Sequence, residues 1–274
     1  MSNCKLHPLV RLTTLCEMNA SDMTQCFVVI LQGRESRVCT GCTPCDFRGA
    51  TMLFFRPGEC KEYVERMKCV ADVRALCYCG DWYARWNVEC TASFFAYSIK
   101  ESLHLSVRER GVIEKCFHDI EAELEWGIDD YSNPLIAQKV KMLLCYCQRF
   151  YDRQHITRSC LNATLMAKIE REVDEYLVSG DNCMTCCHVP VHRFAEPLGL
   201  SDSYFVDFLK RETGKTIEKY VCARHFEVAK RLLLHTSDSL FSIARKLGYH
   251  TVQSFSATFK RVLGCAPNDY RNAN

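Results

Sequence analysis

A short pattern occurs twice between residues 191 and 271, and the two copies lie about 50 residues apart. In each copy an alanine stands three residues before Leu-Gly, a tight turn follows, and a second amphipathic segment ends in a basic pair. The copies consist of Ala195, Leu198, Gly199 and Lys210-Arg211, and of Ala244, Leu247, Gly248 and Lys260-Arg261. They predict a duplicated pair of short helices, each pair joined by a turn.

Each copy meets the local requirements of a helix-turn-helix unit. Ala195 and Ala244 are small enough for the point at which two helices cross, and the glycine after each permits a positive φ. Ser201 and Thr251 are expected to cap the second helix, because their hydroxyls accept hydrogen bonds from free backbone amides. One face of each second helix is apolar, through Tyr204 or Phe205 with Phe208 and Leu209, and through Phe255 with Phe259.

A long helix is predicted between the two copies, from Thr216 to about Leu234. Its apolar stripe consists of Ile217, Val221, Val228, Ala229, Leu232 and Leu233. This helix is expected to fix the distance between the second helices of the two copies. Pro197 lies inside the expected first helix of the first copy, and it predicts a kinked or shortened helix unless that helix begins near Phe194.

This region strongly resembles the AraC/XylS family of transcription activators. The family's first helix-turn-helix unit is similar to "LGLSDSYFVDFLKRETGKT", and its second is similar to "IARKLGYHTVQSFSATFKRVLGCAPNDYR", including Gly264, Pro267, Tyr270 and Arg271. The resemblance implies an all-α tandem helix-turn-helix domain at residues 190–274 that binds double-stranded DNA, with one helix of each unit in a major groove. It also implies a homodimer that contacts RNA polymerase.

The resemblance assigns the residues that face DNA. It places base-reading side chains at Ser203, Val206 and Asp207 and at Val252, Gln253 and Ala257, with His250, Thr251 and Ser256 nearby. Phosphate contacts are expected from Lys210, Arg211, Lys215, Lys260 and Arg261. Gln253 can form two hydrogen bonds with adenine, whereas Asp207 repels phosphates unless it accepts from cytosine N4, and Ala257 can touch only a thymine methyl. The second copy is therefore expected to carry more of the base choice; the alternative is that these residues form only a solvated face.

Charge and hydropathy agree with a DNA-binding domain at the end of the chain. Residues 190–274 hold 13 Lys and Arg against 8 Asp and Glu, and the remaining 189 residues hold 22 against 25. The basic charge is thus concentrated where a duplex would bind, although ordinary surfaces also vary by this much. The sequence has no apolar run near the ~18 residues of a membrane span and no signal-peptide pattern, so a cytoplasmic protein without membrane contact is expected.

The N-terminal part predicts successive β-strands, at "CFVVILQG", "ATMLFFRPGE" and "DVRALCYCGDW", with a hairpin at "SRVCTGCTPCDFRG". Their order resembles the cupin-like β-barrel that serves as sensor domain in many AraC-type regulators. Residues 1–105 are therefore expected to form such a barrel with a pocket for a small effector. The region 26–81 contains no histidine, which disfavours a metal-dependent cupin enzyme, so no catalytic residue and no cofactor are assigned.

Residues 106–189 predict three helices followed by a linker. Ser106 and Glu109 fit a capping box, and apolar stripes continue to Val178. The three helices resemble the family's linker and dimerisation region, the alternative being packing within the chain. The fold class expected for the whole chain is α+β.

Cysteine is unusually common, with 20 residues, and without an export signal reduced thiols are expected. Two clusters have spacings that suit zinc: Cys39, Cys42 and Cys45, which leave zinc one ligand short, and Cys183, Cys186, Cys187, His188 and His192 in the linker. With so many cysteines, close pairs arise by chance, so no metal is assigned. A metal- or thiol-sensing regulator remains an alternative, as does a protein whose helix pairs bind protein. A Cys-zinc methyl acceptor is disfavoured because its paired Cys spacing is not found at the N-terminus.

Overall fold

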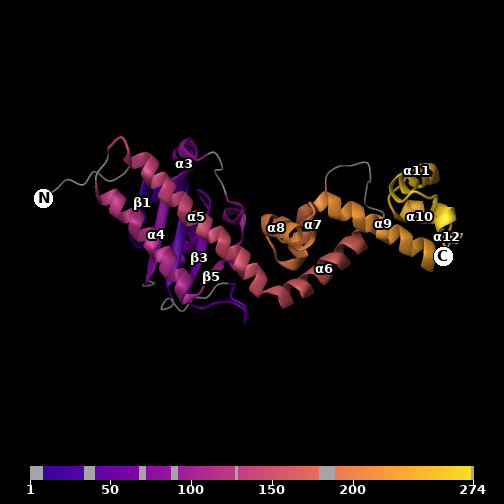
Figure 1. The fold of residues 1–274 in the computed structure, drawn as a ribbon, viewed down its shortest axis with the longest axis horizontal. Helices are drawn as coiled ribbons and strands as arrows, with labels where there is room; N and C mark the ends of the chain where they lie inside the picture. The colour runs from indigo at the N-terminus through magenta and orange to yellow at the C-terminus, as the bar shows by residue number, and fades with distance from the viewer. Residues whose placement is uncertain are drawn as a thin grey trace. The chain divides into compact units, whose positions relative to one another are not determined.

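The computed structural model describes residues 9–33, 41–67, 72–87, 92–126, 129–178 and 189–272. Its contacts divide the chain into two compact units, Met1–Ser159 and Cys160–Asn274, here called the N-terminal and C-terminal units (Figure 1). None of the helices in the described ranges has an apolar stretch long enough to cross a membrane.

The N-terminal unit contains a five-stranded antiparallel sheet with the order β1-β4-β2-β3-β5. Its strands are β1 (Val10–Thr13), β2 (Cys26–Gly33), β3 (Ala50–Phe55), β4 (Val73–Cys79) and β5 (Leu103–Leu105). The three strands expected from the apolar runs are confirmed as β2, β3 and β4. The predicted hairpin lies in the connection from β2 to β3, where Gly33 pairs with Ala50. Residues 34–40 of that connection lie outside the described residues, and residues 41–49 contain no strand.

Helices cover both faces of this sheet (Figure 1). They are α1 (Ala20–Gln25), α2 (Lys61–Met67), α3 (Gly80–Trp86), α4 (Val107–Trp126) and α5 (Ser132–Thr157), with 3-10 turns η2 (Ser93–Ala96) and η3 (Ile99–Glu101). Val29 and Phe54 pack with α4 and α5 on one face, while Val28 and Leu53 pack with α2 on the other. Each such fully buried side chain stabilises the fold by roughly 1.5–3 kcal/mol.

The predicted cupin-like barrel is not confirmed, because the sheet is open. β1 and β5 lie at opposite edges, with three strands between them. The strands are apolar on both faces because helices bury both faces, and two of these helices, α4 and α5, come from the segment expected to form a separate linker region. The predicted capping box at the start of α4 is confirmed, since Ser106 N donates to Glu109 Oε2 at 2.8 Å and Glu109 N donates to Ser106 Oγ at 3.2 Å.

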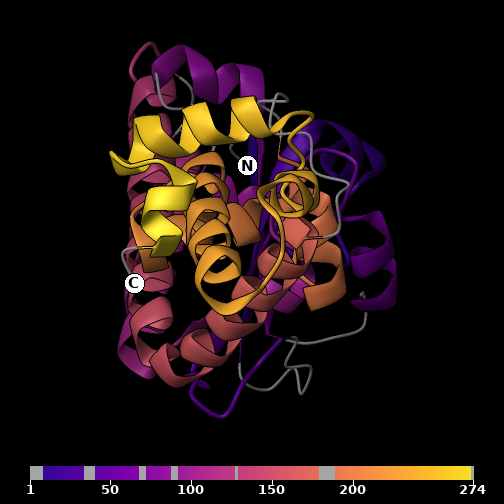
Figure 2. The ribbon, with the colours of Figure 1, turned by 90° about the vertical axis from the view of Figure 1, so that its right-hand side faces the viewer.

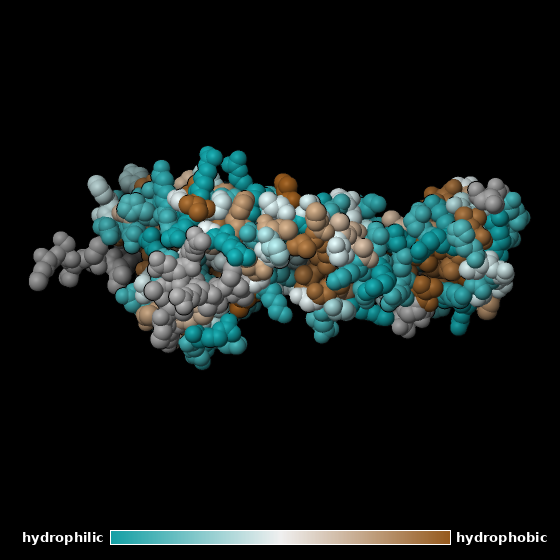
Figure 3. Space-filling view, turned by 90° about the horizontal axis from the view of Figure 1, so that it is seen from below, coloured by the Kyte–Doolittle hydropathy of each residue, from teal (hydrophilic) through white to brown (hydrophobic). Residues whose placement is uncertain are grey.

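The described residues of the C-terminal unit form helices and turns without a strand (Figure 2), and their buried apolar side chains belong to one cluster. Its elements are α6 (Ser159–Val178), α7 (Val191–Ala195), η4 (Glu196–Leu198), α8 (Asp202–Thr213), α9 (Ile217–His235), α10 (Leu240–Lys246), α11 (Val252–Leu263) and α12 (Pro267–Asn272). On the face shown in Figure 3, apolar residues form patches on this unit that are separated by hydrophilic side chains.

Helix α6 packs into the core of the C-terminal unit. Its Ile169, Val173 and Leu177 are fully buried in the same cluster as the aromatic residues of α8 and α11. Asp174 accepts hydrogen bonds from Arg224 of α9, two of them at 2.8 Å. The predicted region 106–189 is therefore divided, with α4 and α5 on the sheet and α6 in the C-terminal unit.

Candidate nucleic-acid interface

The two copies of the sequence pattern have the same backbone hydrogen bonds at their turns. Leu200 N donates to Ala195 O at 3.1 Å, and Tyr249 N donates to Ala244 O at 2.9 Å. Each glycine donates back three residues, Gly199 to Glu196 O and Gly248 to Arg245 O. Their φ angles are 67° and 76°, in the left-handed region that glycine adopts without strain. The turns thus close two helix-turn-helix units, as predicted.

The predicted N-caps are also confirmed. Ser201 Oγ accepts from Tyr204 N at 3.3 Å, and Thr251 Oγ1 accepts from Ser254 N at 3.1 Å. The helices that follow, α8 and α11, each have 12 residues and end at a glycine with positive φ. The second turn is one residue longer, because His250 is inserted between Tyr249 and the cap, and the His250 side chain is exposed.

Burial decides which side chains hold the second helices in place. Phe205, Phe208 and Leu209 of α8 are at most 2% exposed, while Tyr204 is half-buried, so Phe205 is the core residue of the two that the sequence left open. Phe255 and Phe259 of α11 are fully buried, as are Ala195 and Ala244. The core positions predicted for both copies are therefore confirmed.

Pro197 shortens the first helix of the first copy, as expected. Helix α7 ends at Ala195, and the chain continues through the 3-10 turn η4, which contains the proline. Its counterpart α10 forms a continuous helix of seven residues. Both first helices nevertheless place their alanine in the core and lead into the same turn.

The exposed faces of α8 and α11 differ. In α11, Gln253, Ala257, Lys260 and Arg261 are exposed at helical spacing, and His250 and Thr251 are exposed just before them. The candidate base-reading residues Ser203, Val206 and Asp207 of α8 are half-buried, and Val206 packs against the core. The candidates Val252 and Ser256 of α11 are also half-buried, whereas the phosphate candidates Lys210, Arg211 and Lys215 are exposed.

Three side chains outside the candidate faces fix the second copy to the linking helix α9. His225 Nε2 lies 3.1 Å from Leu247 O at the turn, and burial lowers the pKa of His225. Arg271 donates to Leu233 O at 3.0 Å and to Asp238 O at 2.8 Å, and Tyr270 packs edge-on against Phe259. Tyr270 and Arg271 belong to the motif that the sequence shares with the AraC/XylS family, so their importance could be predicted. His225 is only a histidine near the apolar stripe of α9, and nothing in the sequence indicated its contact with the turn.

The linker cysteines predicted as metal candidates, Cys183, Cys186 and Cys187, lie outside the described residues together with His188. His192 is described: it is exposed on α7, and its Nδ1 lies 3.2 Å from Asp202 Oδ1. In the other predicted cluster Cys39 is outside the described residues, Cys42 is half-buried and Cys45 is exposed.

Comparisons with known proteins agree with this geometry. A family described as a helix-turn-helix domain matches residues 194–273. The xylose operon regulatory protein of Escherichia coli (strain K12) is 32% identical over 89 residues, and a putative AraC-like transcription regulator of Streptomyces lividans is 33% identical over 94. Residues 194–273 are an AraC-type helix-turn-helix domain.

The matches to this AraC-type domain cover a limited part of each protein. The matched segment is 32% of this chain in both cases, and it spans 23% of the E. coli protein and 31% of the Streptomyces protein. Among solved structures, the C-terminal domain of AraT, a response regulator from Geobacillus stearothermophilus, is 26% identical. That comparison covers 40% of this chain and 85% of AraT's domain, with a TM-score of 0.32.

Proposed function

We propose that the chain is a sequence-specific DNA-binding transcription regulator of the AraC type. The observation that carries this proposal is the repetition of one turn, cap and core arrangement on a single helical core. Such an arrangement presents two helices, α8 and α11, each with a basic pair near its C-terminal end. We call α8 and α11 the reading helices.

In this proposal the reading helices enter successive major grooves about ten base pairs apart. Lys210, Arg211 and Lys215, with Lys260 and Arg261, contact phosphates and supply affinity that does not depend on sequence. Gln253 reads an adenine edge through its amide. The second copy carries more of the base choice, because α11 exposes a row of side chains where α8 has half-buried ones and Asp207.

The N-terminal unit is proposed to modulate DNA binding in response to an effector. The whole protein is proposed to act in the cytoplasm as a homodimer and to contact RNA polymerase. These parts rest on the resemblance to AraC-type regulators, since the matched relatives align with the helix-turn-helix region.

Selection of genomic DNA fragments on the purified chain tests the proposal. The expected result is enrichment of a common motif, with an affinity that falls linearly with the logarithm of salt concentration. Binding without a common motif and without salt dependence would contradict the proposal and favour a helical module that binds protein.

A further inference from the structure

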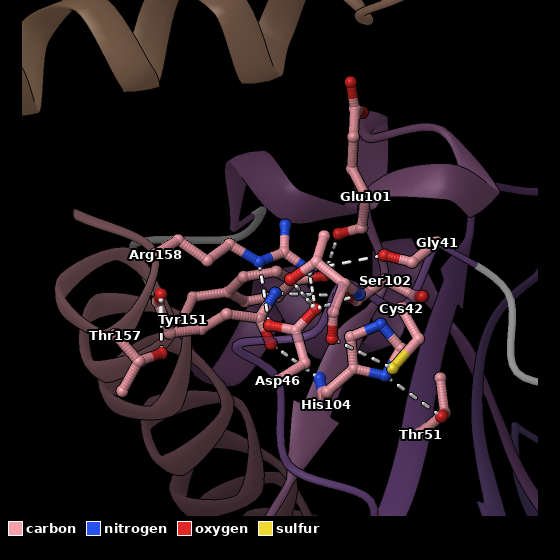
Figure 4. A network of polar contacts seen from close by, with 12 residues as sticks. Gly41, Cys42, Asp46, Thr51, Glu101, Ser102, His104, Tyr151, Thr157 and Arg158 are labelled. Atoms are coloured by element: carbon pink, nitrogen blue, oxygen red, sulfur yellow. Dashed lines mark hydrogen bonds and ion pairs between the residues drawn. The ribbon is translucent and has the colours of Figure 1, made fainter. Parts of the chain in front are cut away.

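A group of three metal-ligating side chains lies in the N-terminal unit, away from the DNA-binding domain. It consists of Cys42 and Asp46, from the connection between β2 and β3, and His104 from β5. One ligand atom from each lies within 4.8 Å of the other two. Figure 4 shows the Cys42 sulfur beside the imidazole ring of His104, in a network that includes Asp46 and Arg158. His104 is fully buried, and so is the side chain of Asp46.

The surroundings of His104 suit a metal ligand. Its Nδ1 lies 3.3 Å from the Thr51 hydroxyl, and its backbone N donates to Gln154 Oε1 at 2.7 Å, so the residue is held in place. Its Nε2 is buried and has no hydrogen bond of good geometry to a described residue, although the Gly41 carbonyl lies near the ring. Histidines that bind metal usually have one ring nitrogen oriented by such a neighbour while the other binds the ion.

Asp46 is shared between this group and Arg158. Its Oδ2 accepts from Thr43 N, Thr43 Oγ1 and Arg158 Nη2, at 2.7, 2.8 and 2.6 Å. Its Oδ1 accepts from Arg158 Nε at 2.8 Å and from no second donor among the described residues. With one donor on Oδ1, that oxygen keeps a lone pair for a metal ion.

We propose that Cys42, Asp46 and His104 bind a divalent transition-metal ion, with Zn²⁺ the best match, and that this ion competes with Arg158 for Asp46. Thiolate, imidazole and carboxylate are the three ligand types of protein zinc sites. Metal–ligand distances of about 2.0–2.3 Å place tetrahedral ligand atoms about 3.3–3.8 Å apart, so each pair of ligand atoms must approach by about 1.5 Å at most. The Cys42 thiol releases its proton to solvent on binding, and a water completes the tetrahedron.

The competition gives the metal a route to regulation, and this step rests on the proposed DNA-binding function. A divalent ion on Asp46 repels the Arg158 guanidinium and weakens the buried ion pair. Arg158 ends helix α5, where its backbone N donates to Gln154 O at 3.1 Å, and Ser159, the next residue, begins α6. Metal binding therefore acts on a residue that lies two positions before the start of the C-terminal unit at Cys160. The effector class proposed for the N-terminal unit is a divalent transition-metal ion.

Cobalt binding to the full chain tests the site directly. The starting protein carries Cys183→Ser, Cys186→Ser and Cys187→Ser, so that the linker cysteines do not contribute, and Co²⁺ reports a bound thiolate by its charge-transfer absorption. Competition with a chromophoric chelator then gives the Zn²⁺ affinity.

The variants probe two of the ligands, Cys42 and His104, and the competitor Arg158. Cys42→Ser should abolish the charge-transfer band, and His104→Gln should weaken Zn²⁺ binding by at least about tenfold. Cys45→Ser, at an exposed cysteine of the same connection, is the matched control and should change neither. Arg158→Gln should tighten Zn²⁺ binding about tenfold or more, because the competing cation is gone. Arg158→Met, which keeps the length of the side chain without its charge, replaces it if that variant does not fold.

Three results would overturn the metal site: no thiolate band in the starting protein, a band unchanged by Cys42→Ser, or equal losses with Cys45→Ser. An unchanged Zn²⁺ affinity in the Arg158 variant would overturn the competition. DNA affinity is measured separately by fluorescence anisotropy, with and without Zn²⁺. Failure to bind DNA both with and without Zn²⁺ refutes the proposed function and leaves the cobalt result standing. A Zn²⁺ effect on DNA affinity that persists in Cys42→Ser refutes regulation through this site.

Discussion

Replacement of Leu177 by alanine tests whether α6 is a structural part of the C-terminal unit. Leu177 is fully buried in the core of that unit, together with Ile169 and Val173 of the same helix. Leu-to-Ala changes at such sites cost about 2–5 kcal/mol, from lost burial and the remaining cavity. Since a domain is stable by only about 5–15 kcal/mol, the C-terminal unit of this variant should unfold at a clearly lower denaturant concentration.

The positions of the tryptophans allow the two units to be followed separately. Trp82, Trp86 and Trp126 all lie in the N-terminal unit, whereas both units contribute helices to the far-ultraviolet circular dichroism. Leu177→Ala should therefore shift part of the circular dichroism transition and leave the tryptophan fluorescence transition unchanged. Leu161→Ala is the control on the same helix, because Leu161 is 41% exposed and its loss should change stability by no more than about 0.5 kcal/mol. A shift of the fluorescence transition, or equal effects from the two variants, would refute the packing of α6 described here.

Three further predictions concern the DNA-binding domain. Gln253→Ala should relax base choice at one position of the site and weaken binding to the preferred sequence by about 1–3 kcal/mol. Ser203→Ala in the first copy should lose less specificity in the same binding-selection assay. Equal losses of specificity from the two variants would contradict the unequal roles of the two copies. Lys260→Ala should weaken all sequences alike and reduce the salt slope by about 1, as measured by anisotropy titrations at several salt concentrations. Burial lowers the pKa of His225 in the folded domain. As the pH falls below about 6.5, the unfolded chain therefore binds a proton at this histidine that the folded chain does not, and the free energy of unfolding should decrease. Urea unfolding of the wild type and of His225→Gln at pH 7.5 and 5.5 measures this, and an equal pH effect in both proteins would refute it.

The helix-turn-helix units could be predicted closely because their signals are local. The turn glycines, the caps Ser201 and Thr251 and the phenylalanine spacing each act within a few residues, and the structure has all of them where the sequence placed them. The choice between Tyr204 and Phe205 could not be made, because neighbouring aromatic residues fit the same stripe and only the packed core selects one of them.

The arrangement of the N-terminal unit depends on contacts between distant segments. An apolar run such as that of β2 is compatible with a closed barrel and with an open sheet covered by helices, and only the packing of α4, α5 and α2 distinguishes the two. The stripe on α6 likewise shows that one face is buried but not which unit buries it. His104 lies near Cys42 because β5 pairs with β3. It lies outside residues 26–81, the region whose lack of histidine disfavoured a metal site, so the sequence did not indicate it as a ligand.

The extra residue in the second turn gives a single chain a direction on DNA. Equivalent residues of the two copies are 49 positions apart up to the turn glycine and 50 apart from the helix cap onward, as expected if a residue was inserted in one copy after a duplication. His250, at the inserted position, gives α11 an exposed side chain at its entrance for which α8 has no equivalent. Unequal halves recognise an asymmetric sequence, so the domain is expected to bind a given site in one orientation only.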